Sequence, residues 1–236
     1  MIKLKNVIKE YRNETVVTMA VDDVNFDIAE GEFVAIIGAS GSGKSTLTHI
    51  MAFLDRPSSG VYQFRDNSIN DLSDDQLARI RNKEMGFVFQ SFALLPRTTI
   101  FENVKLPLIY TGLSQKKINK MTKQAIESTG LSHRSNYFTN QLSGGEQQRT
   151  AIARAIVNNP SVIFADEPTG NLDSKSGQQI LEILQKLNDK GHTIILVTHE
   201  KYTSEMAKRI IEMKDGKIIR DEKITNRKYA KKGLIK

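Results

Sequence analysis

The chain has 236 residues, enough for one large domain, and its 39% hydrophobic and 26% charged residues are typical of a folded globular protein. It contains no Cys, which excludes disulfides and thiolate metal sites, and its apolar runs are far shorter than the roughly 20 residues of a membrane-spanning helix. The net charge of +7 comes almost entirely from residues 223–236, which hold six Lys or Arg and no acid, so the remaining chain, at +1, does not indicate a nucleic-acid-binding face.

The first ninety residues combine strands with short helices. Polar–apolar alternation and short apolar runs predict strands over residues 2–11, 15–28, 33–37, 61–64 and 85–89. Helical spacing predicts helices over residues 45–54 and 72–83, the second with Ser73 as its N-cap.

Residues 91–142 differ, because they show two helical segments and no strand-like run. The segments are FALLPRTTIFENVKLPLIY (92–110) and SQKKINKMTKQAIESTG (114–130), interrupted by Pro96, Pro107 and Gly112. We expect a helical lobe inserted between strands of an α/β core.

The remaining elements alternate again. Helices are predicted over 143–159 and 174–191 and strands over 161–166 and 192–200, which favours right-handed crossovers and a parallel sheet. Residues 209–223 read as a hairpin that turns at Asp215-Gly216.

GASGSGKS, residues 38–45, follows an apolar strand and opens a helix. It fits the phosphate-binding pattern G-x-x-x-x-G-K-[ST], in which glycines let successive backbone N–H groups surround phosphate oxygens at a helix N-terminus. Lys44 is expected to bridge the β- and γ-phosphates, and Ser45 to bind Mg²⁺. We call this loop the first cradle; its candidate nucleotide-binding residues are Gly38, Ala39, Ser40, Gly41, Ser42, Gly43, Lys44, Ser45 and Thr46.

SVIFADEP, residues 161–168, places two acids at the end of an apolar strand. Ligands bind at the carboxyl ends of strands in such sheets. Asp166 is expected to orient the Mg²⁺ shell, directly or through water, and Glu167 to polarise the attacking water as general base. Taken alone, the pair could equally cap a strand end.

LSGGEQQR, residues 142–149, is a second candidate anion site at a helix start. We call residues 143–146 the second cradle: Ser143, Gly144, Gly145 and Glu146. With Tyr11, Gln90, the stretch NLD ending at Asp173, and His199, these motifs resemble those of the ATP-binding-cassette (ABC) ATPases over residues 2–222.

That resemblance implies a P-loop α/β fold with a mixed sheet core, an N-terminal antiparallel β subdomain and an inserted α-helical subdomain. It implies an ATPase domain over 1–222 with the helical subdomain at about 91–150, and a flexible basic tail over 223–236. The tail is either a solvated terminus or a segment attracted to anionic lipid.

The resemblance also assigns roles to single residues. Tyr11 would stack on adenine, Gln90 would contact Mg²⁺ or the water, and His199 would contact the γ-phosphate. Asp173 would contact the first cradle of a second copy. Bland alternatives are a surface Tyr, a structural Gln, a satisfied His and an acid beside a helix N-cap.

Two cradles in one chain are explained if two copies pack head to tail. Each ATP would then lie between the first cradle of one copy and the second cradle of the other, so that ATP and Mg²⁺ hold a homodimer together. The groove beside Gln90 would receive a membrane permease, which would place the chain in the cytoplasm on the inner face of the cell membrane.

Several stretches narrow the resemblance further. FLDRPSSG, FVFQSFALLPRTTIFENVKLPL and DEPTGNLD look like the ATPases of lipoprotein-release and macrolide- or antimicrobial-peptide-efflux systems. Two alternatives stay open: a cell-division or regulatory cassette with little turnover, and a DNA-associated cassette. The short span between Gln90 and LSGG, without heptads, and the nearly neutral body disfavour the second.

Overall fold

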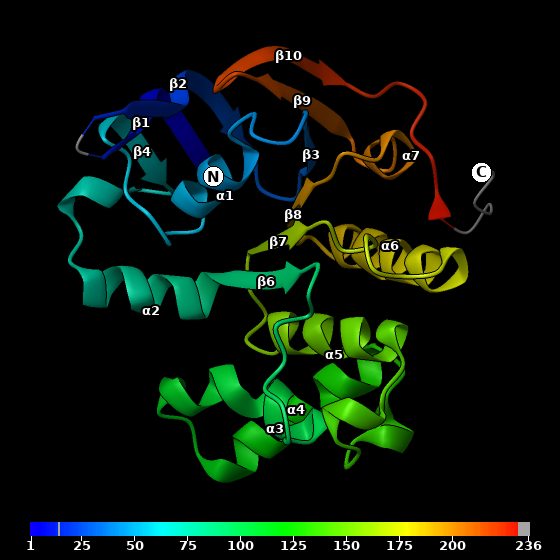
Figure 1. Ribbon diagram of the computed structural model, residues 1–236. Coiled ribbons are helices and arrows are strands. Elements are labelled where there is room, and N and C mark those ends of the chain that lie inside the picture. Colours follow the sequence, from blue (N-terminus) through cyan, green and yellow to red (C-terminus); the bar gives the residue numbers. More distant parts are fainter. Residues whose placement is uncertain (14, 231–236) are drawn as a thin grey trace. The chain divides into compact units, whose positions relative to one another are not determined.

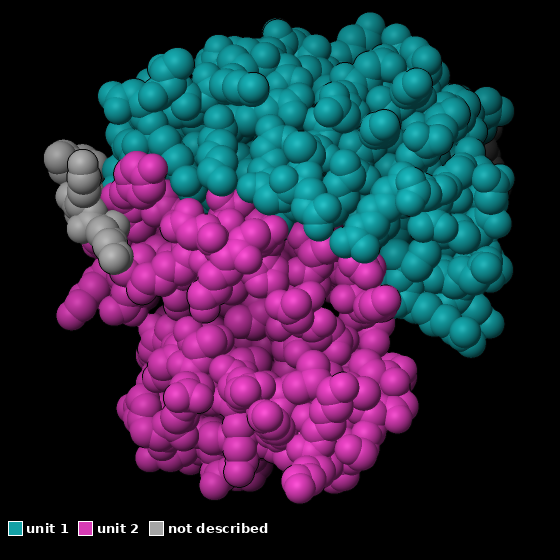
Figure 2. All heavy atoms as spheres, turned by 180° about the vertical axis from the view of Figure 1, so that it is seen from behind, with its two compact units in different colours: residues 1–81, 193–228 teal, residues 82–192, 229–236 magenta. Residues whose placement is uncertain are grey.

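The computed structural model describes residues 1–13 and 15–230. The chain forms two compact units, described separately below and coloured apart in Figure 2. Unit 1 comprises residues 1–81 and 193–228, and unit 2 comprises residues 82–192 together with the chain from 229.

Unit 1 contains an antiparallel sheet with the strand order β2-β1-β4-β5. Its strands are β1 Ile2–Arg12, β2 Val17–Ile28, β4 Ser59–Phe64 and β5 Asn67–Ser68. Alternate residues of β1 such as Ile2 and Leu4 are buried while Lys3 and Lys5 face solvent, as the period of two predicts. This sheet confirms the N-terminal antiparallel β subdomain.

Unit 1 also contains parallel strands, of which the central one, FVAII, is an unbroken apolar run. β3 (Phe33–Ile37) pairs in parallel with both β8 (Thr193–Val197) and β9 (Arg209–Lys214). β10 (Lys217–Lys223) returns antiparallel to β9, so the predicted hairpin is confirmed (Figure 1). Asp215 and Gly216 both have positive φ, 49° and 79°, as a tight two-residue turn requires.

Three α-helices begin in the described residues of unit 1; the first two start within two residues of the predicted positions, and the sequence analysis did not predict the third. They are α1 Lys44–Met51, α2 Asp74–Glu84 and α7 Lys201–Ser204. At the start of α2, Gln76 N donates to Ser73 Oγ at 3.3 Å and Ser73 N donates to Gln76 Oε1 at 2.9 Å, which confirms Ser73 as the cap.

Unit 2 holds a parallel strand pair. β6 (Met85–Phe89) pairs with β7 (Val162–Asp166), and Phe89 lies opposite Asp166 at the carboxyl ends. Helix α5 (Gly144–Ile156) packs against β6. Gly86 permits this contact, since a Cβ there would lie 2.4 Å from the carbonyl oxygen of Ala155.

The remaining α-helices of unit 2 include two that enclose an apolar core together with α5. The remaining helices are α3 Ile100–Lys105, α4 Gln115–Ser128 and α6 Ser174–Asp189, and α3 and α4 pack with α5 (Figure 1). The core of α3, α4 and α5 includes Ile100, Val104, Ile126 and Ala153, which confirms the helical lobe as a feature of the fold. Its bounds at 91 and 150 stay a prediction.

One expected helix is shorter than its sequence suggested. Within residues 92–110, helix α3 starts only at Ile100, where Thr99 and Glu102 form a capping box, and residues 106–111 form a 3₁₀ helix. Phe92, Ala93 and Arg97 have positive φ, which no α-helix tolerates. The expectation of helix from residue 92 was therefore wrong at its start.

The basic C-terminal segment makes specific contacts where it is described. Arg227 Nε donates to Met206 O at 2.8 Å, and Lys228 Nζ pairs with Glu205 at 2.6 Å within unit 1. In unit 2, Ala230 N donates to Gln185 Oε1 at 3.0 Å. Residues 227–230 thus make defined contacts, residues 231–236 lie outside the described residues, and the flexible tail over 223–236 stays a prediction.

Over the described part of the chain, no helix has both the length and the apolar character needed to cross a bilayer.

Candidate functional site

The first cradle in unit 1 links β3 to α1. Gly38, Gly41 and Gly43 have φ of 152°, 79° and 98°, and a Cβ at Gly43 would lie 2.2 Å from Ala20 O. Gly43 is the N-cap of α1 and has no side chain to accept hydrogen bonds from the first backbone N–H groups of the helix. No side chain of the N-cap therefore competes with a ligand for those N–H groups. Such a start fits a phosphate group, which the helix dipole also favours.

Lys44 folds back over the first cradle. Its Nζ donates to Gly38 O at 2.8 Å, Ala39 O at 2.7 Å and Ser42 Oγ at 3.4 Å. Ser45 is exposed and Thr46 half-buried in the first turn of α1, while Ala39, Ser40 and Gly41 form the exposed crest of the loop. The loop therefore holds the Lys44 ammonium group against its own backbone, next to the first turn of α1.

Tyr11 and His199 are the other predicted site residues of unit 1. Tyr11 lies near the end of β1, opposite Thr18, and is 45% exposed. His199 is exposed and follows β8, two residues after Val197. Beside it, Glu200 N donates to Thr198 Oγ at 3.1 Å, and Thr203 Oγ donates to Glu200 at 2.7 Å, which fixes the turn into α7.

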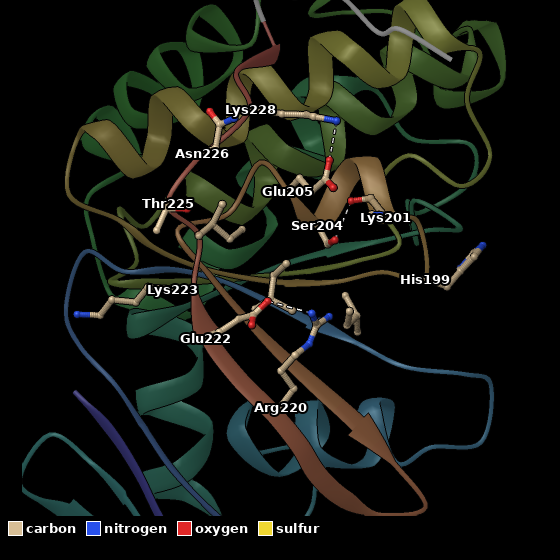
Figure 3. Close-up of a pocket in the computed structure, with 13 residues that line it drawn as sticks. His199, Lys201, Ser204, Glu205, Arg220, Glu222, Lys223, Thr225, Asn226 and Lys228 are labelled. Atoms are coloured by element: carbon tan, nitrogen blue, oxygen red, sulfur yellow. Dashed lines mark hydrogen bonds and ion pairs between the residues drawn. The ribbon is translucent and has the colours of Figure 1, made fainter.

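His199 also borders a pocket of about 750 Å³ that the sequence did not indicate (Figure 3). Its walls come from β9, β10, α7 and residues 223–228. Two ion pairs line it, Arg220 with Glu222 at 2.9 Å and Lys228 with Glu205 at 2.6 Å. Arg220 and Glu222 both lie on β10, whereas the Lys228–Glu205 pair joins residues 23 positions apart, so no single local motif indicates the pocket.

In unit 2, the acidic pair stands at the end of β7. Asp166 is the last residue of the strand, and Glu167 follows with φ of 44°, an uncommon value for a residue other than Gly. Such backbone outliers gather at functional sites. Gln90 follows β6, whose last residue pairs with Asp166, so unit 2 brings all three side chains to the same strand ends.

Two amide side chains, those of Gln148 and Asn171, hydrogen-bond the backbone near the carboxyl ends of β6 and β7. Gln148 is fully buried, and its Nε2 donates to Pro168 O at 2.8 Å and Phe89 O at 3.3 Å. Asn171 Nδ2 donates to Gln90 O at 3.1 Å. Both residues lie inside recognised motifs, but sequence reasoning gave neither a role, because their partners are 20 to 81 residues away.

The second cradle is the N-terminus of α5. Ser143 is its N-cap: Ser143 N and Oγ both donate to Glu146 Oε2 at 2.9 Å, and Glu146 N donates to Ser143 Oγ at 3.4 Å. Arg134 Nε lies 2.8 Å from Glu146 Oε1. Partial burial alone would raise the pKa of Glu146, but the Ser143 hydrogen bonds and the charges of Arg134 and Arg149 lower it.

The starts of α5 and α6 meet in unit 2. A Cβ at Gly145 would lie 2.8 Å from Ser176 Oγ and 3.0 Å from Ser176 Cβ, so a larger residue there would have to displace the Ser176 side chain. Asp173 is the N-cap of α6 and accepts from Ser176 N at 3.0 Å. The bland alternative for Asp173 had it beside the cap, whereas it is the cap. Two helix N-termini thus lie together, which concentrates positive potential.

The chain matches known proteins along most of its length. Residues 21–170 match the family described as ABC transporter. The macrolide export ATP-binding/permease protein MacB of Bdellovibrio bacteriovorus is 49% identical over 95% of this chain, which spans only 34% of that relative. The uncharacterized ABC transporter ATP-binding protein MJ0796 of Methanocaldococcus jannaschii is 48% identical over 95% of this chain and 97% of its own.

Solved structures of other proteins also match this chain. A dimeric post-hydrolysis state of the ATP-binding cassette MJ0796, bound to ADP and Pi, matches with a TM-score of 0.87 and 46% identity, covering 95% of this chain and 99% of that chain. The cbiO1 protein of Clostridium perfringens, part of the ABC transporter complex cbiONQ, has a TM-score of 0.84 at 30% identity, covering 94% and 88%.

Proposed function

The chain belongs to the ABC transporter family as an ATP-binding domain, and from that premise we propose that it binds and hydrolyses ATP as a head-to-tail homodimer that drives a membrane permease. The observation that carries the proposal is the similarity, over 95% of this chain, to a cassette whose dimer holds ADP and Pi. The two cradles of this chain give that similarity a physical basis.

The first cradle binds the phosphates in this proposal. Backbone amides of residues 38–46 surround the β-phosphate, and Lys44 exchanges its carbonyl partners for phosphate oxygens. Tyr11 stacks on adenine, and His199 contacts the terminal phosphate.

Glu167 acts as general base toward the water, beside Asp166 and Gln90. Ser45, Gln90 and Asp166 would hold Mg²⁺, directly or through water, a donor set that suits a hard cation bound mainly by substrate phosphates. When bound, Mg²⁺ neutralises the charge of the phosphate chain.

The second cradle completes the site of a second copy. Ser143, Gly144, Gly145 and Glu146 start α5, and Asp173 starts α6 beside it, so both helix dipoles favour an anion supplied from outside. One loop and one Lys leave much of the terminal phosphate charge uncompensated. ATP therefore stabilises the dimer, and hydrolysis lets it open.

The helical lobe supplies the contact with a permease in this proposal. Leu95, Ile109, Tyr110 and Phe138 are exposed there, from 44% to 76%, which suits a hydrophobic partner surface. The MacB relatives are named as export ATP-binding/permease proteins, which favours an export or mechanotransmission role at the inner face of the membrane.

The test is the quaternary state of a variant that binds but does not hydrolyse. Glu167→Gln removes the base while keeping the side-chain size, so we expect MgATP to convert it from monomer to dimer in light scattering. Lys44→Ala in the same background is the control and should stay monomeric without bound nucleotide. A monomeric Glu167→Gln protein saturated with MgATP contradicts the shared site.

A regulatory or cell-division cassette is the second candidate, since the same fold could recruit partners with little turnover. Steady-state ATPase rates with and without a co-purified membrane partner separate the two. A transport motor shows turnover that rises with the partner, whereas a recruiting cassette stays slow in both states.

A further inference from the structure

The ring of Tyr11 is held by residues outside the recognised nucleotide motifs. Tyr11 Oη donates to Asp55 Oδ2 at 3.0 Å. On the ring itself, Lys9 Nζ lies 5.1 Å from the centroid, a cation–π distance. Since Tyr11 is still 45% exposed, Lys9 leaves ring surface available to another flat group.

Asp55 and Lys9 also bind each other. Lys9 Nζ donates to Asp55 Oδ1 at 2.6 Å and to Arg56 O at 2.8 Å, and Arg56 N donates to Asp55 Oδ1 at 2.7 Å. The side chains of Lys9 and Asp55 are only 13% and 29% exposed. Partial desolvation strengthens such charge-assisted bonds, so the three side chains form one rigid set.

The pKa of Asp55 agrees with that geometry. Burial alone would raise it, but the hydrogen bonds from Lys9, Tyr11 and the backbone of Arg56 hold the pKa below the ordinary value of an Asp. The carboxylate is therefore charged at neutral pH and accepts from the Tyr11 hydroxyl throughout the physiological range.

Asp55 is tied to the helix that begins at the first cradle. Leu54 N and Asp55 N donate to His49 O, in the last turn of α1, at 2.9 Å and 3.2 Å. The next residue, Arg56, donates to Ile69 O at 3.0 Å and Leu72 O at 2.8 Å. Asp55 therefore joins the far end of the phosphate-binding helix to the strand that carries Tyr11.

We infer that Asp55, with Lys9, is a positioning residue that fixes the Tyr11 ring as a platform for a purine base at a set distance from the phosphate cradle. The inference rests on the proposed function, since it assigns the base-binding end of the same site. Lys9 covers part of the ring and leaves the remainder for stacking, a contact made by the flat face of the base. A preordered ring loses less conformational freedom when the nucleotide binds.

Two probes separate positioning of the base from general stability. MgATP carries the base, whereas magnesium tripolyphosphate carries only the phosphate chain. In displacement titrations with a fluorescent ATP analogue, we expect Asp55→Asn and Lys9→Met to weaken MgATP about three- to tenfold, the effect of losing one or two net hydrogen bonds. The affinity of the same variants for tripolyphosphate should stay within about twofold of the wild-type affinity. The control Glu182→Gln, which breaks a surface ion pair on α6, should change the affinity for neither MgATP nor tripolyphosphate.

A double-mutant cycle tests whether the effect passes through the ring. In a Tyr11→Ala background, Asp55→Asn should weaken MgATP no further, because the platform is already absent. Tyr11→Phe keeps the ring but loses the hydroxyl bond, and should weaken MgATP about two- to fivefold. It also keeps the Lys9–Asp55 pair, so it remains informative if Asp55→Asn folds poorly.

Three results would overturn the inference: equal weakening of both probes, additive losses in the Tyr11→Ala background, or wild-type MgATP affinity in Tyr11→Phe. Failure of the wild-type chain to bind MgATP at all would instead overturn the proposed function.

Discussion

At the scale of single residues, the lowered pKa of Glu146 in the second cradle should make the stability of the folded chain fall at acid pH. Its pKa is lowered in the folded chain, so its stabilising contribution is present above the unfolded Glu value of about 4.3 and is lost as pH falls through the lower folded value. We expect Glu146→Gln to cost about 1 kcal/mol at pH 7, as a weakened cap, and to flatten the fall in melting temperature below about pH 5. Thermal melts of both proteins from pH 3 to 7 measure this, and parallel curves would disprove it.

The places of several candidate site residues in the fold could be predicted because short motifs fix them relative to helix starts and strand ends, while their roles stay a proposal. Ser143 at a helix start, Asp166 at a strand end and the glycines of the first cradle lie where the motif placed them. Their orienting partners could not be predicted. Asp55 contacts Tyr11 across 44 residues, and its stretch FLDRPSSG pointed only to a subfamily.

At the scale of elements, replacing two different glycines by Ala should change the stability of the fold in opposite directions. Gly86 lies where α5 crosses β6, so the Cβ of Gly86→Ala would meet backbone at 2.4 Å and force strand and helix apart. We expect a loss of about 1–3 kcal/mol in urea unfolding, as overpacking gives. Gly177→Ala is the matched control: its Cβ would meet Thr169 at an ordinary 3.5 Å, and helix propensity should add about 0.5–1 kcal/mol to α6. Equal effects would refute the crossing as the cause.

Element types were predictable where an apolar run was continuous, as in β3 and β7, or where helical periodicity was regular, as in α6. The prediction failed over residues 92–99, where apolar content suggested helix. There Arg97 adopts positive φ and the capping box at Thr99 sets the true start of α3. Amino-acid composition does not indicate the sign of φ. Here the positive φ of Phe92 and Ala93 accompanies tertiary contacts, because Arg154 donates to the carbonyl oxygens of both residues.

At the scale of the whole molecule, the two cradles should be separable between copies. Lys44→Ala disables the first cradle, and Ser143→Arg blocks the second with a bulky cation that also breaks its capping box. In a Glu167→Gln background, we expect each variant alone to remain monomeric with MgATP, because no homodimer retains a complete site.

Mixing those two variants restores one complete site, in which the intact first cradle of one copy faces the intact second cradle of the other. We expect MgATP-dependent heterodimers, detected by capture through a tag on one variant only, with weaker association than the Glu167→Gln parent because only one nucleotide joins the pair. Two copies of the same variant serve as the control. Dimers in a single-variant sample, or none in the mixture, would show that each copy surrounds its nucleotide alone.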